Sequence, residues 1–114
     1  MHIKQMSNKN VNEIFKCLIN TIESLSYNNL SDDGIDDVLE ELEGDYYTFM
    51  HIDNLKILEH NGCITIDNTV LILDLREKIQ ALPPNLWNNY DFKNSIKWHY
   101  IRNDAVKILK EIIR

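Results

Sequence analysis

The sequence predicts a single all-α domain of about five helices, and three observations support this fold class. The 114 residues include only three glycines and two prolines, so few turns are forced, which favours helices over an all-β fold. Apolar residues make up 44% and charged residues 26%, the composition of a folded globular chain. Apolar side chains also recur at helical spacing along most of the chain. A chain of this length is expected to fold around one core, so residues 1–114 should form one domain.

The first helix is expected over residues 11–26, after an N-terminus of residues 1–9 that is expected to be flexible. Asn10 is a favourable N-cap, and Glu13 three residues later completes the pattern of a capping box. Residues 27–30 are expected to form the loop that ends this helix. One stripe of the expected helix carries the apolar residues Val11, Ile14, Phe15, Leu18, Ile19, Ile22 and Leu25.

A second and a third helix are expected in the acidic middle of the chain. Ser31 or Asp32 should cap the second helix, and Gly44 should end it, because glycine often follows the last helical turn. Asp45 should cap the third helix, which ends near residues 60–62. This third helix is expected to be the most buried, because its apolar residues lie all round the helix. The buried face of the second helix is expected to consist of Ile35, Val38, Leu39 and Leu42.

Residues 63–73 allow two interpretations. Their β-branched residues, with Asp67 and Asn68 in the middle, are compatible with a short β-hairpin. The alternative is a short link followed by a helix that is capped by Asp67 or Asn68 and continues to about residue 82. Helical spacing favours the second interpretation, because one face of such a helix would carry Ile72, Leu75, Ile79 and Leu82. Pro83 and Pro84 then end the element, since proline cannot continue a helix interior.

The last helix is expected to begin near Asp91 and to continue almost to Arg114. A loop or a short turn of helix over residues 85–90 should precede it. Trp98 falls on the apolar stripe of this helix and is therefore expected in the core. Trp87 lies in the preceding polar segment, so it could equally anchor the core or form an exposed contact.

Acidic side chains are concentrated in residues 31–47. This stretch holds eight acidic residues and no basic one, which is more negative charge than the net charge of −6 of the whole chain. Three explanations are open: a metal site, a solvated helix face, or a docking surface for a basic partner.

The metal interpretation depends on an alignment with the twelve-residue calcium loop of an EF-hand. Much of the oxygen-ligand spacing of that loop is met by Asn29, Ser31, Asp33, Gly34, Asp37 and Glu40. However, a neutral asparagine stands at the first position, where a carboxylate is expected. The apolar stripe of the second helix also continues through the alignment. A capped acidic helix is therefore predicted, with no metal and no cofactor.

The sequence contains no catalytic motif, so a protein without enzymatic activity is predicted. No phosphate-binding glycine loop or nucleophile elbow is present, and none of the four histidines has metal-site spacing. The acidic net charge argues against nucleic-acid binding. No apolar run approaches the ~18 residues of a membrane span, and no signal peptide is recognisable. Together with two cysteines expected to be free and reduced, this predicts a cytoplasmic protein.

The segment ALPPNLWNNYDFKNSIKWHYIRNDAVKIL, residues 81–109, resembles a pattern found in small immunity proteins. Immunity proteins are encoded beside secreted bacterial toxins, including contact-dependent growth-inhibition toxins. The resemblance implies a cytosolic, non-catalytic protein that binds one toxin domain, and many such toxins are nucleases with basic clefts. No functional residue of that family corresponds to a particular position in this chain.

The acidic segment leads independently to the same hypothesis. A carboxylate-rich helix can cover an electropositive nuclease cleft, and charge complementarity accelerates association. The alternatives are an interaction or regulatory module of another bacterial pathway and a calcium-binding helical module. The residues predicted to bind the basic partner are Asp33, Asp36, Asp37, Glu40, Glu41, Glu43, Tyr46, Tyr47 and Trp87.

Overall fold

The structure, a computed structural model, describes residues 8–26 and 32–113 of the chain. Within these ranges every regular element is helical and no strand occurs, which confirms the predicted all-α class. The expected flexible N-terminus, the expected loop over residues 27–30 and the expected cap at Ser31 lie wholly or largely outside the described residues. The elements are α1 (Asn8–Ser26), α2 (Asp32–Phe49), α3 (Ile52–His60), α4 (Ile66–Gln80), the 3₁₀ turn η1 (Pro84–Leu86), α5 (Asn89–Asn94) and α6 (Ile96–Ile112).

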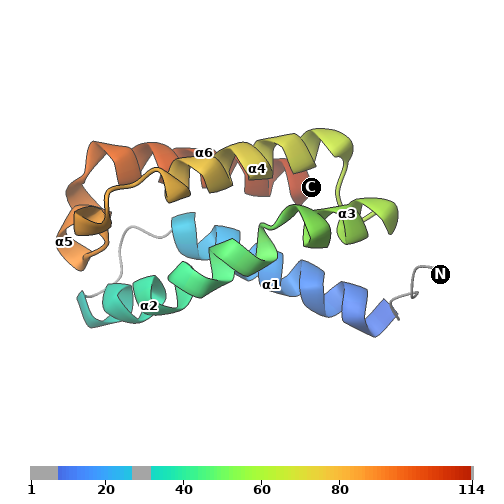
Figure 1. Cartoon of the computed structure of the whole chain (residues 1–114), viewed down its shortest axis with the longest axis horizontal. Coiled ribbons are helices and arrows are strands. Elements are labelled where there is room, and N and C mark those ends of the chain that lie inside the picture. Colours follow the sequence, from blue (N-terminus) through green and yellow to red (C-terminus); the bar gives the residue numbers. More distant parts are fainter. Residues whose placement is uncertain (1–7, 27–31, 114) are drawn as a thin grey trace.

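The helices form two layers around one core. Helices α1 and α2 make one layer and α4 and α6 the other, while α3 and α5 lie at opposite ends of the molecule (Figure 1). The layers meet mainly where α1 packs against α6, and α4 packs beside α6 in its own layer. The result is an elongated body with extents of 47 × 25 × 23 Å.

The core consists of the apolar stripes expected from the sequence. Leu18, Ile22 and Leu25 of α1 are fully buried, as are Ile35 of α2 and Ile72 of α4. Each such side chain contributes roughly 1.5–3 kcal/mol on leaving water. The first stripe therefore predicts the buried face of α1 correctly, although α1 begins at Asn8 and the expected cap Asn10 lies inside the helix.

The boundary between the second and third helices differs from the prediction. Gly44 does not end α2, which continues to Phe49, and the third helix begins only at Ile52. The cap of α3 is His51, whose Nδ1 accepts a hydrogen bond from the Asp53 N–H at 3.1 Å. A glycine inside a helix costs only about 1 kcal/mol, and the buried face of α2 outweighs that cost.

Helix α3 is consequently short, with nine residues, and it is not the all-round buried helix that the sequence suggested. Leu55 and Leu58 are fully buried, but Ile52 is exposed. The apolar residues that suggest a helix buried all round belong in part to the end of α2, so they lie on the buried faces of two helices rather than all round one.

For residues 63–73, the helix interpretation is confirmed and the hairpin interpretation is wrong. The cap of α4 is Thr65 rather than Asp67 or Asn68. Thr65 Oγ1 accepts from the Asn68 N–H, and Asn68 Oδ1 accepts from the Thr65 N–H, both at 3.0 Å. Asn68 thus completes a capping box from the third helical position. The helix ends at Gln80, shortly before Pro83.

The expected final helix is divided in two at Ser95. Ser95 has extended backbone dihedrals and caps α6 by accepting from the Lys97 N–H at 3.2 Å. Asn88 likewise caps α5 through the Asp91 N–H at 2.9 Å, so the predicted start at Asp91 is three residues too late for the cap. Asparagine and serine are both favourable N-cap residues, but neither position was predicted as a cap.

Trp98 and its neighbours fill the core at the α5 end of the molecule. Trp98 is fully buried, as predicted, and its indole Nε1 donates a hydrogen bond to the Leu86 carbonyl at 2.7 Å. The Phe92 ring lies 4.9 Å from the Trp98 ring, centroid to centroid. Arg102, also buried, donates to the Phe92 carbonyl and places its guanidinium 5.1 Å from the Phe92 ring centroid. These contacts hold η1 and α5 against α6.

Candidate partner-binding surface

All six carboxylates predicted to bind a partner lie exposed on α2. They cover the side of the helix opposite the buried residues Ile35, Leu39 and Leu42. We call this surface the acidic face and define it by Asp33, Asp36, Asp37, Glu40, Glu41 and Glu43.

The acidic face has almost no internal charge compensation. None of its six carboxylates forms an ion pair with a residue in the ranges 8–26 and 32–113. One polar contact is present, in which Asn89 Nδ2 of α5 donates to Asp36 Oδ1 at 3.1 Å. The negative charge of the face is therefore presented to solvent.

The arrangement of these carboxylates works against helix stability. Asp33 and Asp36 lie near the N-terminus of α2, where the helix dipole favours negative charge. Glu40, Glu41 and Glu43 lie beyond that first turn. Like charges at i,i+3 and i,i+4 spacing repel by about 0.2–0.5 kcal/mol per pair, and several such pairs run along this face. Helix formation alone does not explain the clustering.

The described part of the calcium-loop alignment is helical. Asp33, Gly34, Asp37 and Glu40 all belong to α2, while Asn29 and Ser31 lie outside the described residues. In a helix, Asp33 and Glu40 are separated by about 10 Å along the axis, so they cannot converge on one ion as they would in a loop. No cluster of three or more His, Cys, Asp or Glu side chains suited to a metal ion occurs among the residues that the structure describes.

Tyr46 at the end of α2 packs against Trp87 at the edge of the core. Both side chains are half-buried, and their ring centroids are 6.0 Å apart with an interplanar angle of 32°. Trp87 also meets Trp98 edge-on at 5.2 Å and 81°. Burial raises the pKa of Tyr46, and nearby Glu43 raises it further against the opposing effect of Arg76. Of the two roles considered for Trp87, the structure shows the packing role, with part of the ring still exposed.

Tyr47 is the more exposed of the two adjacent tyrosines, at 57%. The Arg76 guanidinium from α4 lies 4.8 Å from its ring centroid, and Arg76 Nη2 donates to the Tyr47 carbonyl at 3.1 Å. Tyr47 therefore lies exposed beside the acidic face, and a cation from the other layer contacts its ring and its carbonyl.

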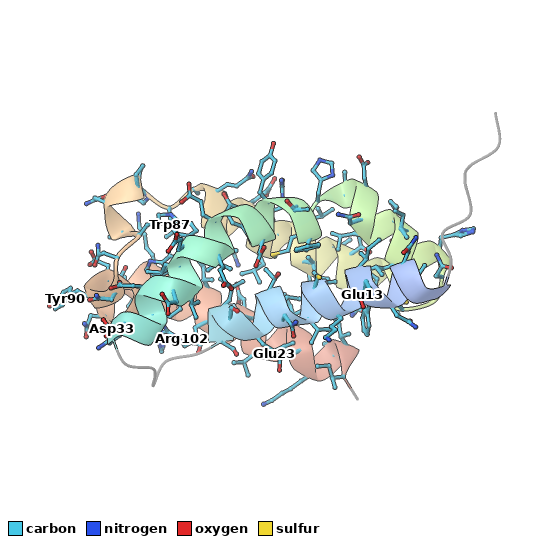
Figure 2. The ribbon with its side chains drawn as sticks, turned by 90° about the horizontal axis from the view of Figure 1, so that it is seen from below. Glu13, Glu23, Asp33, Trp87, Tyr90 and Arg102 are labelled. Atoms are coloured by element: carbon cyan, nitrogen blue, oxygen red, sulfur yellow. The ribbon has the colours of Figure 1, made fainter. Side chains whose placement is uncertain are left out.

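Tyr90, which was not among the predicted site residues, lies next to the acidic face. Tyr90 is 69% exposed on α5, and its neighbour Asn89 binds Asp36. Figure 2 shows Tyr90 and Asp33 at the same end of the molecule. The polar run around Tyr90 indicated exposure, but its proximity to α2 results from tertiary packing.

The predicted site residues therefore fall into two groups. The six carboxylates and Tyr47 share an exposed surface, which Tyr90 extends at one end. Tyr46 and Trp87 lie beneath its edge and support it.

Among the described residues, no helix combines the length and the apolar character that crossing a membrane requires.

The chain matches no known family model, no curated protein and no solved structure.

Proposed function

We propose that this protein is a non-enzymatic immunity protein that acts in the cytoplasm and neutralises a bacterial toxin by direct binding through the acidic face. The observation that supports the proposal is the set of six exposed carboxylates on α2 without an ion-pair partner among the described residues. A surface of this kind is complementary to a basic protein rather than to nucleic acid or to another acidic surface.

The cost of the clustering strengthens this interpretation. Neighbouring like charges weaken α2 slightly, and no other described group compensates them. A basic partner would remove the repulsion on binding. The same field would accelerate association, to as much as ~10⁸–10⁹ M⁻¹s⁻¹ at low salt, which suits an inhibitor that must act before its target does.

The partner class follows from the same chemistry. A nuclease cleft holds phosphates and is therefore electropositive, so a nuclease toxin fits the acidic face. Aromatic residues often supply binding energy that charge alone does not. Tyr47 and Tyr90 are the exposed aromatic residues beside this face, and both are more than half exposed.

The experiment reverses three carboxylates at the centre of the face: Asp37→Lys, Glu40→Lys and Glu41→Lys. The test measures protection of cells that co-express the toxin domain encoded beside the gene of this protein, together with binding kinetics at two salt concentrations. We expect protection to be lost, association to slow by about tenfold or more at low salt, and the salt dependence to flatten.

A matched control reverses Glu13, Asp67 and Glu77, which are exposed carboxylates outside the face. This control has the same change in net charge as the central variant. If the location of the charge matters, its association rate and its protection of cells should stay close to those of the unmodified protein. Equal protection and equal rates for the central variant would show that the acidic face is only solvated surface.

A further inference from the structure

A groove of about 350 Å³ lies on the layer formed by α4 and α6, away from the acidic face. It is lined by the end of α4, the turn that follows and the first turns of α6: Lys78, Ala81, Leu82, Lys97, Tyr100 and Ile101. Leu82 and Ile101 are buried and form an apolar floor, and Tyr100, 59% exposed, forms a wall. The groove is a partly open depression, so a ligand inside it would keep one side in solvent.

The two lysines of the groove are not equivalent. Lys78 Nζ is 2.7 Å from Asp104 Oδ2 and 3.1 Å from Asp74 Oδ2, so two carboxylates already hold its charge. Lys97 is exposed and forms no ion pair with a residue in the described ranges. An incoming anion would be repelled at the Asp74–Asp104 side and attracted at the Lys97 side.

The local backbone adds to the positive potential near Lys97. Lys97 lies in the first turn of α6, which contains no acidic residue. A lysine there opposes the helix dipole, so its position is unfavourable for α6 itself.

We propose that this groove binds a polypeptide segment of a protein partner, with an apolar side chain on the Leu82–Ile101 floor and an adjacent carboxylate paired with Lys97. The groove favours a segment in which a carboxylate follows or precedes an apolar side chain, because Lys97 and the apolar floor line the same groove. A pocket for a small molecule usually encloses most of its ligand, whereas this groove is partly open to solvent. An open groove suits a side chain that remains attached to a larger partner.

The proposal is independent of the proposed function, because the groove and the acidic face lie in different layers (Figure 1). The acidic face attracts a basic partner, whereas the groove selects an acidic and apolar segment. Failure of either one leaves the other unchanged.

The probe is a capped tetrapeptide that ends in Asp-Leu, titrated into isotopically labelled full-length protein while amide chemical shifts are recorded. One apolar side chain and one exposed ion pair predict millimolar affinity. Shift changes should cluster on Leu82, Lys97, Tyr100 and Ile101. The same peptide with Asn in place of Asp should bind about threefold or more weakly.

Two variants and one control make the test decisive. Lys97→Gln should weaken binding of the Asp peptide by about threefold, whereas Lys107→Gln, exposed on the same helix but outside the groove, should leave it unchanged. Ala81→Phe should fill the groove and abolish the shifts. The spectra themselves report whether each variant is folded.

Three outcomes would overturn the proposal. One is the absence of clustered shifts up to ~10 mM peptide, well beyond the affinity expected. Another is equal binding of the Asp and Asn peptides. The third is tighter binding of octanoate than of the peptide at the same amides, which would assign the groove to a small aliphatic acid instead of a protein partner.

Discussion

Two buried side chains of α6 satisfy backbone carbonyls of neighbouring elements. Trp98 donates to the Leu86 carbonyl, and Arg102 donates to the Phe92 carbonyl. Burial lowers the pKa of Arg102, although a guanidinium stays protonated throughout the physiological range. Such bonds fix where η1 and α5 sit on α6, because an unsatisfied buried carbonyl would cost about 1–3 kcal/mol.

Replacing Trp98 with alanine should destabilise the protein by about 3–5 kcal/mol, because it leaves a cavity in the centre of the core. The Leu86 carbonyl would also lose its donor. Urea unfolding measures the change, and Tyr90→Ala, at a 69% exposed aromatic residue, is the control with an expected loss under about 1 kcal/mol. A similarly small loss for Trp98→Ala would show that this packing is wrong.

Glu59 is expected to make stability depend on pH. Its pKa is lowered, chiefly because the Thr69 hydroxyl donates to Glu59 Oε2 at 2.8 Å, and Lys56 adds to the effect. A carboxyl with a lowered folded-state pKa stabilises the fold above its unfolded pKa, and this stability is lost as the pH falls through the folded value. Carbon-detected NMR titration should therefore show a pKa of Glu59 that is lower than the ordinary glutamate value.

Thr69→Val supplies the comparison for that titration. It removes the hydroxyl and retains the shape of the side chain, so the pKa of Glu59 should move back up towards its ordinary value. Stability should then respond less to acidification than in the unmodified protein. If Glu59 titrates at the same pH with and without the hydroxyl, the hydrogen bond does not control it.

At the scale of helices, Gly44 and Gly62 have opposite roles. Gly44 lies inside α2, where a Cβ would meet no atom within 4 Å. Gly62 follows α3 with a φ of +77°, in the left-handed region that side chains disfavour. The first glycine is therefore dispensable and the second is required.

Gly44→Ala should stabilise the protein by about 0.5–1 kcal/mol, because alanine restricts the unfolded chain and suits the helix. Gly62→Ala should destabilise it by about 1–2 kcal/mol through backbone strain. Urea unfolding of both variants should therefore give changes in the free energy of unfolding that have opposite signs at the two sites. A stabilising effect at Gly62, or a destabilising one at Gly44, would contradict the helix boundaries described here.

The helical stripes could be predicted from sequence because burial of an apolar face is a local pattern repeated along one element. Helix ends were less predictable, since Gly44 resembles a stop but lies inside α2, and Ser95 divides what was expected to be one helix. The six carboxylates of the acidic face were predictable for the same reason as the stripes. The positions of Trp87 and Tyr90 beside α2 were not, because they depend on how α5 packs in three dimensions.

At the scale of the whole molecule, the acidic face and the groove with Lys97 differ in charge and lie on different layers. The acidic face belongs to the α1–α2 layer, and the groove with Lys97 belongs to the α4–α6 layer (Figure 1). The six carboxylates of the acidic face are exposed on one side of the molecule, whereas the buried apolar residues form one cluster. Changes to these surface charges should therefore leave the packing of the core largely unchanged.

Neutralising the acidic face should therefore make the protein more stable. Asp37→Asn, Glu40→Gln and Glu41→Gln together remove several like-charge neighbours, each worth a few tenths of a kcal/mol. The gain should shrink when urea unfolding is repeated at high salt, because salt screens exposed charges. Lower stability of this variant would mean that the carboxylates have stabilising partners within the protein.

Helix α5 has only six residues, far fewer than the ~12–15 that an isolated helix needs to persist in water. Helix α5 is therefore stabilised by tertiary contacts: the Phe92 side chain is fully buried, and the Arg102 guanidinium donates to the Phe92 carbonyl. Short elements of this kind open locally at a lower free energy than the core does. The end of the acidic face at Tyr90 is therefore expected to open before the core does, and amide hydrogen exchange should be faster in α5 than in α6.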